Sequence, residues 1–279
     1  MAQKMNNLNG KEWLHNSFSI WREIRKSKEE ISLKHPALFP SQLVEKFINI
    51  YTRDNGEVIL DPFLGIGSSL IASLKNSRAG IGCELNEEYC ALANKRIASN
   101  KLDLIDQEIF EQKILIGDNR ETLKTIPTES VDLSISSPPY WDILNQKRTA
   151  DKKEIVNYSN SNTDIGNISS YEEYLENLKQ VYSEVFRTLK YNKRCVVNVM
   201  DLRKKDKFFP LHIDVSKIMT EIGFELEDIV IWDRQHEYNN MKTLGYPWVF
   251  RINKVHEYCL IFWKREVVLP KKTREKIKK

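Results

Sequence analysis

The sequence has little cysteine, no long apolar run and no apolar leader. Its four cysteines, Cys83, Cys90, Cys195 and Cys259, show no C-x-x-C spacing. This argues against a zinc site or a disulfide framework and makes a reducing cytoplasm the expected location. No apolar stretch approaches the roughly 18 residues that a transmembrane helix needs, and residues 1–10 lack the apolar core of a signal peptide. We therefore expect a cytoplasmic protein with no membrane partner and no metal.

Net charge is also small. The formal charge is +4, and the basic tail at 270–279 holds six Lys or Arg and one Glu, so the rest of the chain carries −1. Global charge thus gives weak support for a nucleic-acid partner. Residues 234–256 support such a partner more strongly, because they combine four basic residues with four aromatic residues and one acidic residue. Such a segment can track phosphates and stack on bases, or it is a solvated loop anchored by its aromatic side chains.

Strands and helices are predicted to alternate. Short apolar runs predict strands at 58–60, 79–83, 114–116, 131–135, 194–199, 224–232 and 256–263. Apolar residues at helical spacing predict helices at 13–34, 42–51 with Ser41 as N-cap, 68–76, 88–101, 171–189 and 215–222. This order predicts an α/β fold with a Rossmann-like, mostly parallel sheet, helices on both faces and an antiparallel edge hairpin formed by the last two strands.

We expect residues 1–279 to form a single domain that includes an N-terminal helical segment at 11–34. Two segments, 142–170 and 235–253, fit no regular element. Long irregular loops in compact domains are often functional. Both follow the ends of predicted strands, so we expect them to crowd the same face of the sheet and to serve in recognition.

The run Ser-Ser-Pro-Pro-Tyr-Trp at 136–141 follows a predicted buried strand. Two prolines stop the strand because neither has an N–H group to donate. The turn presents a hydroxyl group, free backbone carbonyls and two aromatic faces. That combination suits the binding of a flat ring that bears an amino group, although a plain strand-ending turn explains the run equally well.

A second motif, Asp-Pro-Phe-Leu-Gly-Ile-Gly-Ser-Ser at 61–69, follows another strand and opens a helix. Its glycines allow a tight turn and a close approach to a ligand, and the helix start offers free N–H groups. Glu84 ends the next strand, where a carboxylate can accept both hydroxyls of a ribose. The absence of Gly-Lys-Ser/Thr excludes a P-loop. The pattern predicts a nucleotide-like ligand.

With these two motifs the chain resembles the amino-methylating DNA methyltransferases, which transfer a methyl group from S-adenosylmethionine to cytosine N4 or adenine N6. Residues 61–67 look like their cofactor loop and 137–140 like their catalytic motif. Residues 35–48 and 256–258 are similar to two weaker motifs. The resemblance implies the class I methyltransferase fold. Members with this motif order often carry a large C-terminal recognition domain, whereas only about fifteen residues follow Trp263 here. We expect recognition to come from the loops, the N-terminal helix or a partner.

The resemblance also implies roles for individual residues. The catalytic set is Ser137, Pro138, Pro139 and Tyr140. The cofactor set is Pro40, Asp61, Phe63, Gly65, Gly67, Ser68, Glu84, Asp118 and Asn119. The basic residues of the two loops expected to contact DNA are Lys147, Arg148, Arg234, Lys242 and Arg251.

Alternatives remain for several of these positions. Asp118 either contacts the adenine amine or caps a helix, and Phe63 packs under the cofactor, in the core, or both. Pro40 and Ser41 close the methionine pocket, or Ser41 only caps a helix. His256 and Glu257 either orient the catalytic loop or form a surface pair.

The exocyclic amine of a base is a poor nucleophile because its lone pair is delocalised into the ring. Two acceptors beside its hydrogens, Ser137 Oγ and the Pro138 carbonyl, can draw it toward a tetrahedral geometry, mainly by positioning. Tyr140 would stack on a base flipped out of duplex DNA. Serine before Pro-Pro favours cytosine N4 by resemblance.

Adenine N6 or RNA amino methylation and a non-catalytic DNA-binding subunit are the alternatives. No cysteine follows a proline, which disfavours C5 methylation. The resemblance leaves room for a homodimer and for a cognate restriction endonuclease as further partners.

Overall fold

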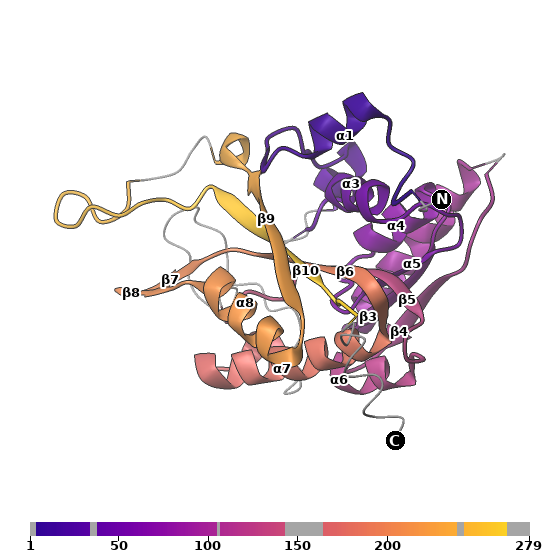
Figure 1. Ribbon diagram of the computed structural model, residues 1–279. Helices are drawn as coiled ribbons and strands as arrows, with labels where there is room; N and C mark the ends of the chain where they lie inside the picture. The colour runs from indigo at the N-terminus through magenta and orange to yellow at the C-terminus, as the bar shows by residue number, and fades with distance from the viewer. Residues whose placement is uncertain (1–3, 34–37, 105–106, 143–163, 239–242, 267–279) are drawn as a thin grey trace, which may run out of the picture.

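The computed structural model describes residues 4–33, 38–104, 107–142, 164–238 and 243–266. An eight-stranded sheet runs through the centre, in the order β1-β9-β10-β6-β5-β2-β3-β4 (Figure 1). Its strands are β1 (Ile20–Trp21), β2 (Val58–Asp61), β3 (Ala79–Glu84), β4 (Gln112–Ile116), β5 (Val131–Ser136), β6 (Leu189–Val199), β9 (Glu225–Asp233) and β10 (His256–Trp263). All neighbouring strands pair in parallel except β10, which is antiparallel to both β6 and β9.

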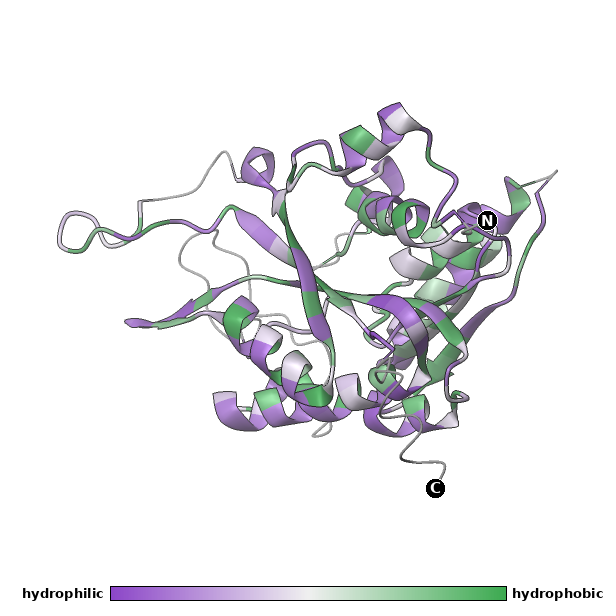
Figure 2. Ribbon diagram, in the orientation of Figure 1, coloured by the Kyte–Doolittle hydropathy of each residue, from purple (hydrophilic) through white to green (hydrophobic). Residues whose placement is uncertain are grey.

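Helices cover both faces of this sheet. One layer holds α3 (Ser41–Tyr51), α4 (Ser68–Lys75) and α5 (Glu87–Leu102), and the other holds α6 (Asn119–Thr122), α7 (Tyr171–Thr188) and α8 (Leu211–Ile222) (Figure 1). Strand side chains alternate between the layers, since Leu60 packs with the α7 cluster and Ile59 with the α3 cluster. Both layers show mixed apolar and polar colouring along each helix, as amphipathic helices should (Figure 2). The predicted fold class is therefore confirmed.

The predicted helix at 13–34 is wrong. The segment forms α1 (Gly10–Asn16), strand β1 and α2 (Lys28–Ser32). Asn9 and Ser27 each begin a helix with a capping box, with Glu12 and Glu30 as the reciprocal partners. Between the two helices Trp21 is buried against Phe47, with ring centroids 4.8 Å apart. Burial of this indole as part of a strand therefore outweighs the helical pattern.

Two further expectations need correction. The antiparallel hairpin of β9 and β10 is not the edge of the sheet, because β1 pairs outside β9. Ser41 is not the N-cap of α3: Pro40 occupies that position without a side-chain cap, and the Ser41 N–H donates to Glu30 Oε1 at 2.8 Å. The cap is thus supplied by α2, a long-range contact that has no local sequence pattern.

A second sheet was not predicted. Strands β7 (Leu202–Lys204) and β8 (Lys207–Phe209) form a small antiparallel hairpin beyond the end of β6. Three residues per strand and three lysines give no alternating apolar pattern, so the sequence offers no hairpin signal.

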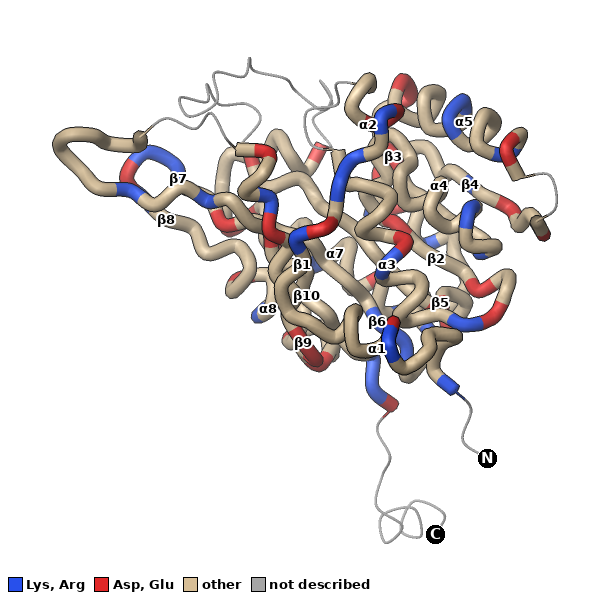
Figure 3. The backbone as a smooth tube through the Cα atoms, turned by 90° about the horizontal axis from the view of Figure 1, so that it is seen from above, with Lys and Arg blue, Asp and Glu red and all other residues tan. Residues whose placement is uncertain are grey.

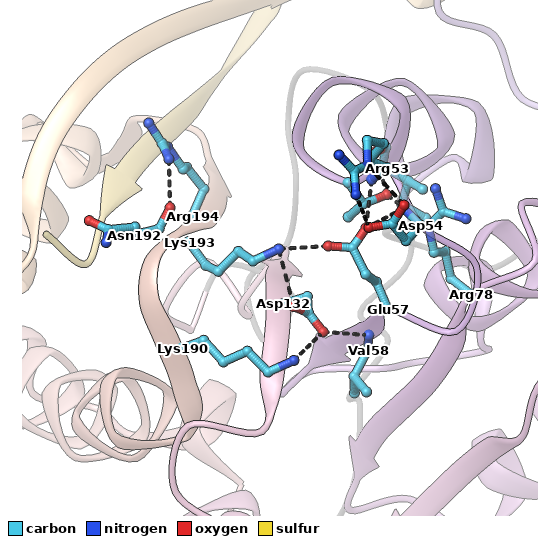
Figure 4. Close-up of polar contacts among 12 residues, drawn as sticks. Arg53, Asp54, Glu57, Val58, Arg78, Asp132, Lys190, Asn192, Lys193 and Arg194 are labelled. Atoms are coloured by element: carbon cyan, nitrogen blue, oxygen red, sulfur yellow. Dashed lines mark hydrogen bonds and ion pairs between the residues drawn. The ribbon is translucent and has the colours of Figure 1, made fainter. Parts of the chain in front are cut away.

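The amino-terminal edge of the sheet is held by a cluster of charges around Asp132 (Figure 4). This side chain lies at an irregularity in the pairing of β5 with β6. It accepts hydrogen bonds from Lys190 Nζ at 2.8 Å and Val58 N at 3.1 Å, and Lys193 Nζ lies 3.1 Å away. Burial opposes ionisation, but these contacts hold the pKa of Asp132 below its ordinary value. The cluster is structural and lies opposite the edge described next.

Candidate active site

A pocket opens where the carboxyl ends of β2, β3, β4 and β5 meet, the usual ligand position in an open α/β sheet. Nine of the residues predicted for cofactor binding and catalysis line it: Asp61, Phe63, Gly65, Ser68, Glu84, Asp118, Asn119, Ser137 and Pro139. Four others, Pro40, Gly67, Pro138 and Tyr140, are not among the lining residues. One pocket thus brings together the two motifs, which are about 70 residues apart in sequence.

The cofactor loop is fixed by Asp61 at the end of β2. Its Oδ1 accepts from Phe63 N at 3.0 Å and its Oδ2 from Ser69 Oγ at 2.6 Å. Burial raises the pKa of Asp61 to about 6, against the lowering effect of these hydrogen bonds. The carboxylate therefore shapes the loop from inside.

The two glycines of the loop serve different purposes. Gly67, with φ +88°, starts α4, and a Cβ there would lie 2.9 Å from Ala93 Cβ, so it allows α4 and α5 to pack closely. Gly65 has φ +56° and nothing within 4 Å of the position of a Cβ. Since Gly65 lines the pocket, its bare backbone leaves room for a ligand.

Glu84 lies across the pocket at the end of β3. Gly65 N donates to its Oε2 and Asn86 N donates to its Oε1, each at 2.8 Å. Burial raises the pKa of Glu84 to about 7, although these backbone hydrogen bonds lower it. A carboxylate has about four lone-pair sites, so each oxygen keeps capacity to accept a further hydroxyl.

Asp118 takes the helix-capping role that was considered for it, and it also lines the pocket. It caps α6 by accepting from Arg120 N at 2.9 Å, and it pairs with the Arg120 guanidinium while lining the pocket. Asn119 beside it donates to the Pro62 carbonyl at 3.0 Å, which ties the β4 turn to the cofactor loop. Phe63 likewise both lines the pocket and packs near the buried Tyr182, with ring centroids 6.2 Å apart.

The turn at 136–141, called the catalytic turn below because it resembles the catalytic motif of the family, is organised around the hydroxyl of Tyr140. This hydroxyl donates to Glu257 Oε2 at 2.8 Å, accepts from Asn198 Nδ2 at 2.9 Å and lies 3.0 Å from Ser137 Oγ. Because its proton goes to Glu257, the Ser137 hydroxyl must donate to the Tyr140 oxygen. Ser137 Oγ also accepts from Asn198 Nδ2 at 3.4 Å, which leaves one lone pair to accept from a ligand.

The two proline carbonyls of the turn differ in whether they already accept hydrogen bonds. The Pro139 carbonyl accepts from Trp141 N at 3.0 Å and from Tyr174 Oη at 2.7 Å. No donor in the described part of the chain reaches the Pro138 carbonyl. The turn therefore keeps capacity to accept further hydrogen bonds at two atoms, Ser137 Oγ and the Pro138 oxygen.

Glu257 is itself held by Arg234. The two side chains form an ion pair, and Arg234 Nη2 also donates to Glu237 Oε2 at 2.6 Å. Glu257 is only 3% exposed, so it orients the catalytic turn and is not a surface residue. Arg234 was predicted to contact DNA, but its guanidinium belongs to this internal network. Lys147, Arg148 and Lys242, three of the other predicted DNA contacts, lie outside the described residues.

A sequence profile of the DNA methylase family, which covers N6 and N4 enzymes, matches residues 2–95 and 131–279. The chain belongs to this family. Among curated relatives, the orphan methyltransferase M.BamHII of Bacillus amyloliquefaciens is 36% identical over 84 residues, which are 29% of this chain and 31% of the relative. The type II methyltransferase M.MjaVI of Methanocaldococcus jannaschii is 29% identical over 111 residues, or 40% of this chain and 49% of that protein. The matches thus span less than half of these relatives.

One solved structure supports the fold, and another is reported for its sequence similarity. The precorrin-6y C5,15-methyltransferase of Geobacter metallireducens GS-15 matches 87% of this chain and 94% of its own with a TM-score of 0.50 at 12% identity. The putative DNA modification methylase TTHA0409 of Thermus thermophilus, solved in complex with S-adenosyl-L-methionine, is 30% identical over 57% of this chain and 59% of its own, with a TM-score of 0.39. No helix in the described parts of this family member is long and apolar enough to cross a membrane.

Several pocket residues were missed from the sequence. Leu38, Phe39, Tyr89, Asp164 and Ile165 all line it. Leu38 and Phe39 immediately precede Pro40, so the segment expected to close the methionine end does reach the pocket. Asn198 was also missed, although an asparagine inside the apolar run Val-Val-Asn-Val of β6 is a visible signal.

Proposed function

We propose that this chain is an S-adenosylmethionine-dependent DNA methyltransferase that modifies the N4 amine of cytosine. The observation that carries the proposal is that Ser137, whose oxygen keeps a lone pair, lines the same pocket as Glu84 and Gly65. An acceptor for an amine and a binding site for a nucleoside thus share one cavity.

The donor set of the pocket fits S-adenosylmethionine. Glu84 would accept the ribose hydroxyls with the lone pairs that its backbone partners leave unused, and the bare backbone of Gly65 gives the ligand room to approach. Asp118 would accept from the adenine amine. When bound, the cofactor supplies an electrophilic methyl group on a sulfonium.

The protein's part in transfer is to position the target amine. Ser137 Oγ and the Pro138 oxygen accept its two hydrogens, which turns the nitrogen lone pair away from the base ring and toward the methyl group. Glu257 acts through Tyr140: by accepting the hydrogen bond of the tyrosine hydroxyl, it fixes the direction in which the Ser137 hydroxyl donates. Arg234 is a positioning residue that pairs with Glu257 in a buried site.

Cytosine is favoured over adenine because a serine precedes Pro-Pro, as in the N4 enzymes that the chain resembles. The target base would leave the duplex and stack on the half-buried ring of Tyr140. A homodimer and a cognate endonuclease remain predictions from the resemblance.

The test is methyl transfer from tritium-labelled S-adenosylmethionine to unmethylated genomic DNA, followed by mass spectrometry of the nucleosides. We expect N4-methylcytosine. Adenine N6 methylation would replace the base assignment, and cofactor binding without transfer to any DNA would refute the enzymatic reading in favour of a non-catalytic subunit.

Ser137→Ala should abolish transfer while the affinity for the cofactor stays unchanged, because the serine holds only the amine. Ser136→Ala is the matched control. Its hydroxyl is bonded to Tyr182, away from the pocket lining, so this variant should retain transfer. A Ser137→Ala variant that methylates normally would contradict the acceptor assignment.

A further inference from the structure

A protruding arm, residues 243–255, leads into the start of β10 and extends away from the body (Figure 1). Its large side chains face solvent: Trp248 is 89% exposed, Phe250 94%, Tyr246 79% and Ile252 69%. Figure 2 shows apolar stretches on this arm even though it lies outside the core. Exposed aromatic side chains gathered in this way mark an interaction surface.

The tip of the arm is a turn that is fixed by backbone hydrogen bonds. The Gly245 carbonyl accepts from Trp248 N at 2.8 Å and from Val249 N at 2.7 Å. Gly245 has φ +78°, and a Cβ there would lie 2.2 Å from the Val249 carbonyl oxygen, so glycine is required. The backbone thus holds Trp248 and Phe250 outward.

The base of the arm rests on the β7–β8 hairpin. Arg251 donates to the Lys205 carbonyl at 3.1 Å and pairs with Asp206, and Lys254 Nζ lies 5.0 Å from the Phe208 ring centroid. We call the arm and this hairpin together the arm–hairpin surface. It carries six basic residues, Arg203, Lys204, Lys205, Lys207, Arg251 and Lys254, and one acidic residue, Asp206 (Figure 3).

This surface lies at the same edge of the sheet as the pocket. The hairpin follows the carboxyl end of β6, and the arm leads into the amino end of β10, which lies beside the carboxyl end of the antiparallel β9. Lys204 also connects the hairpin to the catalytic turn, because its Nζ pairs with Asp142 and lies 4.1 Å from the Trp141 ring centroid. The arm–hairpin surface and the catalytic turn therefore lie at the same edge of the sheet and are in contact through Lys204.

We propose that the arm–hairpin surface binds duplex DNA, with Arg203, Lys205 and Lys207 on phosphates and Trp248 and Phe250 stacked against bases near the methylated site. This inference rests on the proposed function. The charge supports DNA as the partner, since a six-to-one basic surface complements phosphates. It disfavours a second copy of the chain, because an isologous contact would set this charge against itself.

The test is binding of a fluorescein-labelled duplex of about 40 base pairs and mixed sequence, measured by anisotropy from about 50 to 200 mM NaCl. Trp248→Ala/Phe250→Ala should weaken binding about tenfold or more, because each base stacked on an aromatic ring contributes substantially. Trp248→Phe/Phe250→Tyr keeps both rings and should bind like the wild type.

The basic residues have a separate readout. Arg203→Ala/Lys205→Ala/Lys207→Ala should lower the slope of log affinity against log salt by about 2 to 3, or about one per phosphate contact. Matched controls lie at the opposite edge of the sheet. Leu102, 79% exposed at the end of α5, and the exposed Lys101 and Lys113 should all tolerate alanine without any change in binding.

The tip variant is Trp248→Ala/Phe250→Ala. The proposal is overturned if this variant binds duplex DNA as the wild type does. It is also overturned if the only effect of the substitutions is to convert a dimer to a monomer in sedimentation. Failure here is distinct from failure of the enzymatic proposal. Normal methylation by a tip variant with normal DNA affinity would refute the arm alone, whereas arm-dependent DNA binding without methylation would refute the enzymatic function alone.

Discussion

Removing the hydroxyl of Tyr140 isolates the feature on which the proposed mechanism depends. Tyr140→Phe keeps the ring but deletes the atom that lies 3.0 Å from Ser137 Oγ, 2.8 Å from Glu257 Oε2 and 2.9 Å from Asn198 Nδ2. Glu257 keeps Asn198 and Arg234 as partners. Ser137 loses the acceptor that fixes the direction of its proton.

The size of the effect follows from these contacts. One or two net hydrogen bonds are lost, at about 1 kcal/mol each, so the free energy of unfolding should fall by about 1–2 kcal/mol. If the misdirected Ser137 hydroxyl costs the transition state about 1.4–2.8 kcal/mol, kcat falls about 10- to 100-fold. Cofactor affinity should not change, because Tyr140 does not line the pocket.

Single-turnover methyl transfer to genomic DNA and calorimetric titration with S-adenosylmethionine measure these quantities. Tyr182→Phe is the matched control, since it also deletes a buried hydroxyl, the one bonded to Ser136, and should leave transfer intact. Tyr140→Ala should in addition weaken DNA binding through the lost ring. Wild-type transfer by Tyr140→Phe would refute the directed chain from Ser137 to Glu257.

Two further predictions concern charge. Because the pKa of Glu84 is raised to about 7, affinity for S-adenosylmethionine should be about tenfold lower at pH 6 than at pH 8. In calorimetric titrations Glu84→Gln should remove this pH dependence. A wild-type affinity that does not change with pH would contradict the carboxylate role. The same raised pKa means that between about 4.3 and 7 the folded state binds the extra proton, so this group lowers stability as pH rises. Asp132→Asn should lower the free energy of unfolding by about 2 kcal/mol, which is less than the loss of a fully buried ion pair because the Lys190 side chain is 42% exposed. Methyl transfer per folded molecule should be unchanged. Since the pKa of Asp132 is lowered, its contribution is present above about 3.9 and disappears as pH falls further, so thermal melts of the variant and the wild type should converge in acid.

The sequence predicted those parts of the site that depend on local chemistry. Asp61 and Glu84 end their strands and Ser137 directly follows one, and parallel strands bring such ends together. For Glu257 the sequence left two roles open, orienting the catalytic turn or forming a surface pair. Its contact with Tyr140 depends on the pairing of β10 with β6, in which Cys259 faces Asn198. Pairing between strands that lie far apart in the chain has no local signature.

The same reason explains the errors. Arg234 looked like a DNA contact because it starts a basic, aromatic segment, and only the fold shows that Glu257 and Glu237 take its guanidinium. The helix expected at 13–34 failed because a two-residue strand, β1, is too short to alter a periodic pattern. Capping boxes at Asn9 and Ser27 were the available signals for its interruption.

The pairing of β1 with β9 constrains the order in which the protein is completed. Ile20 lies opposite Ile231 and Trp21 opposite Trp232, about 210 residues later in the chain. During synthesis at roughly 5–20 residues per second, the N-terminal segment must wait about 10–40 s before its strand partner leaves the ribosome. Over that interval the indole of Trp21 can pack against α3, where Phe47 and Lys46 contact it, but its strand partner is absent. Closure of the sheet is therefore a late event in biosynthesis, and any protein made without β9 leaves this aromatic edge open to chaperones or to aggregation.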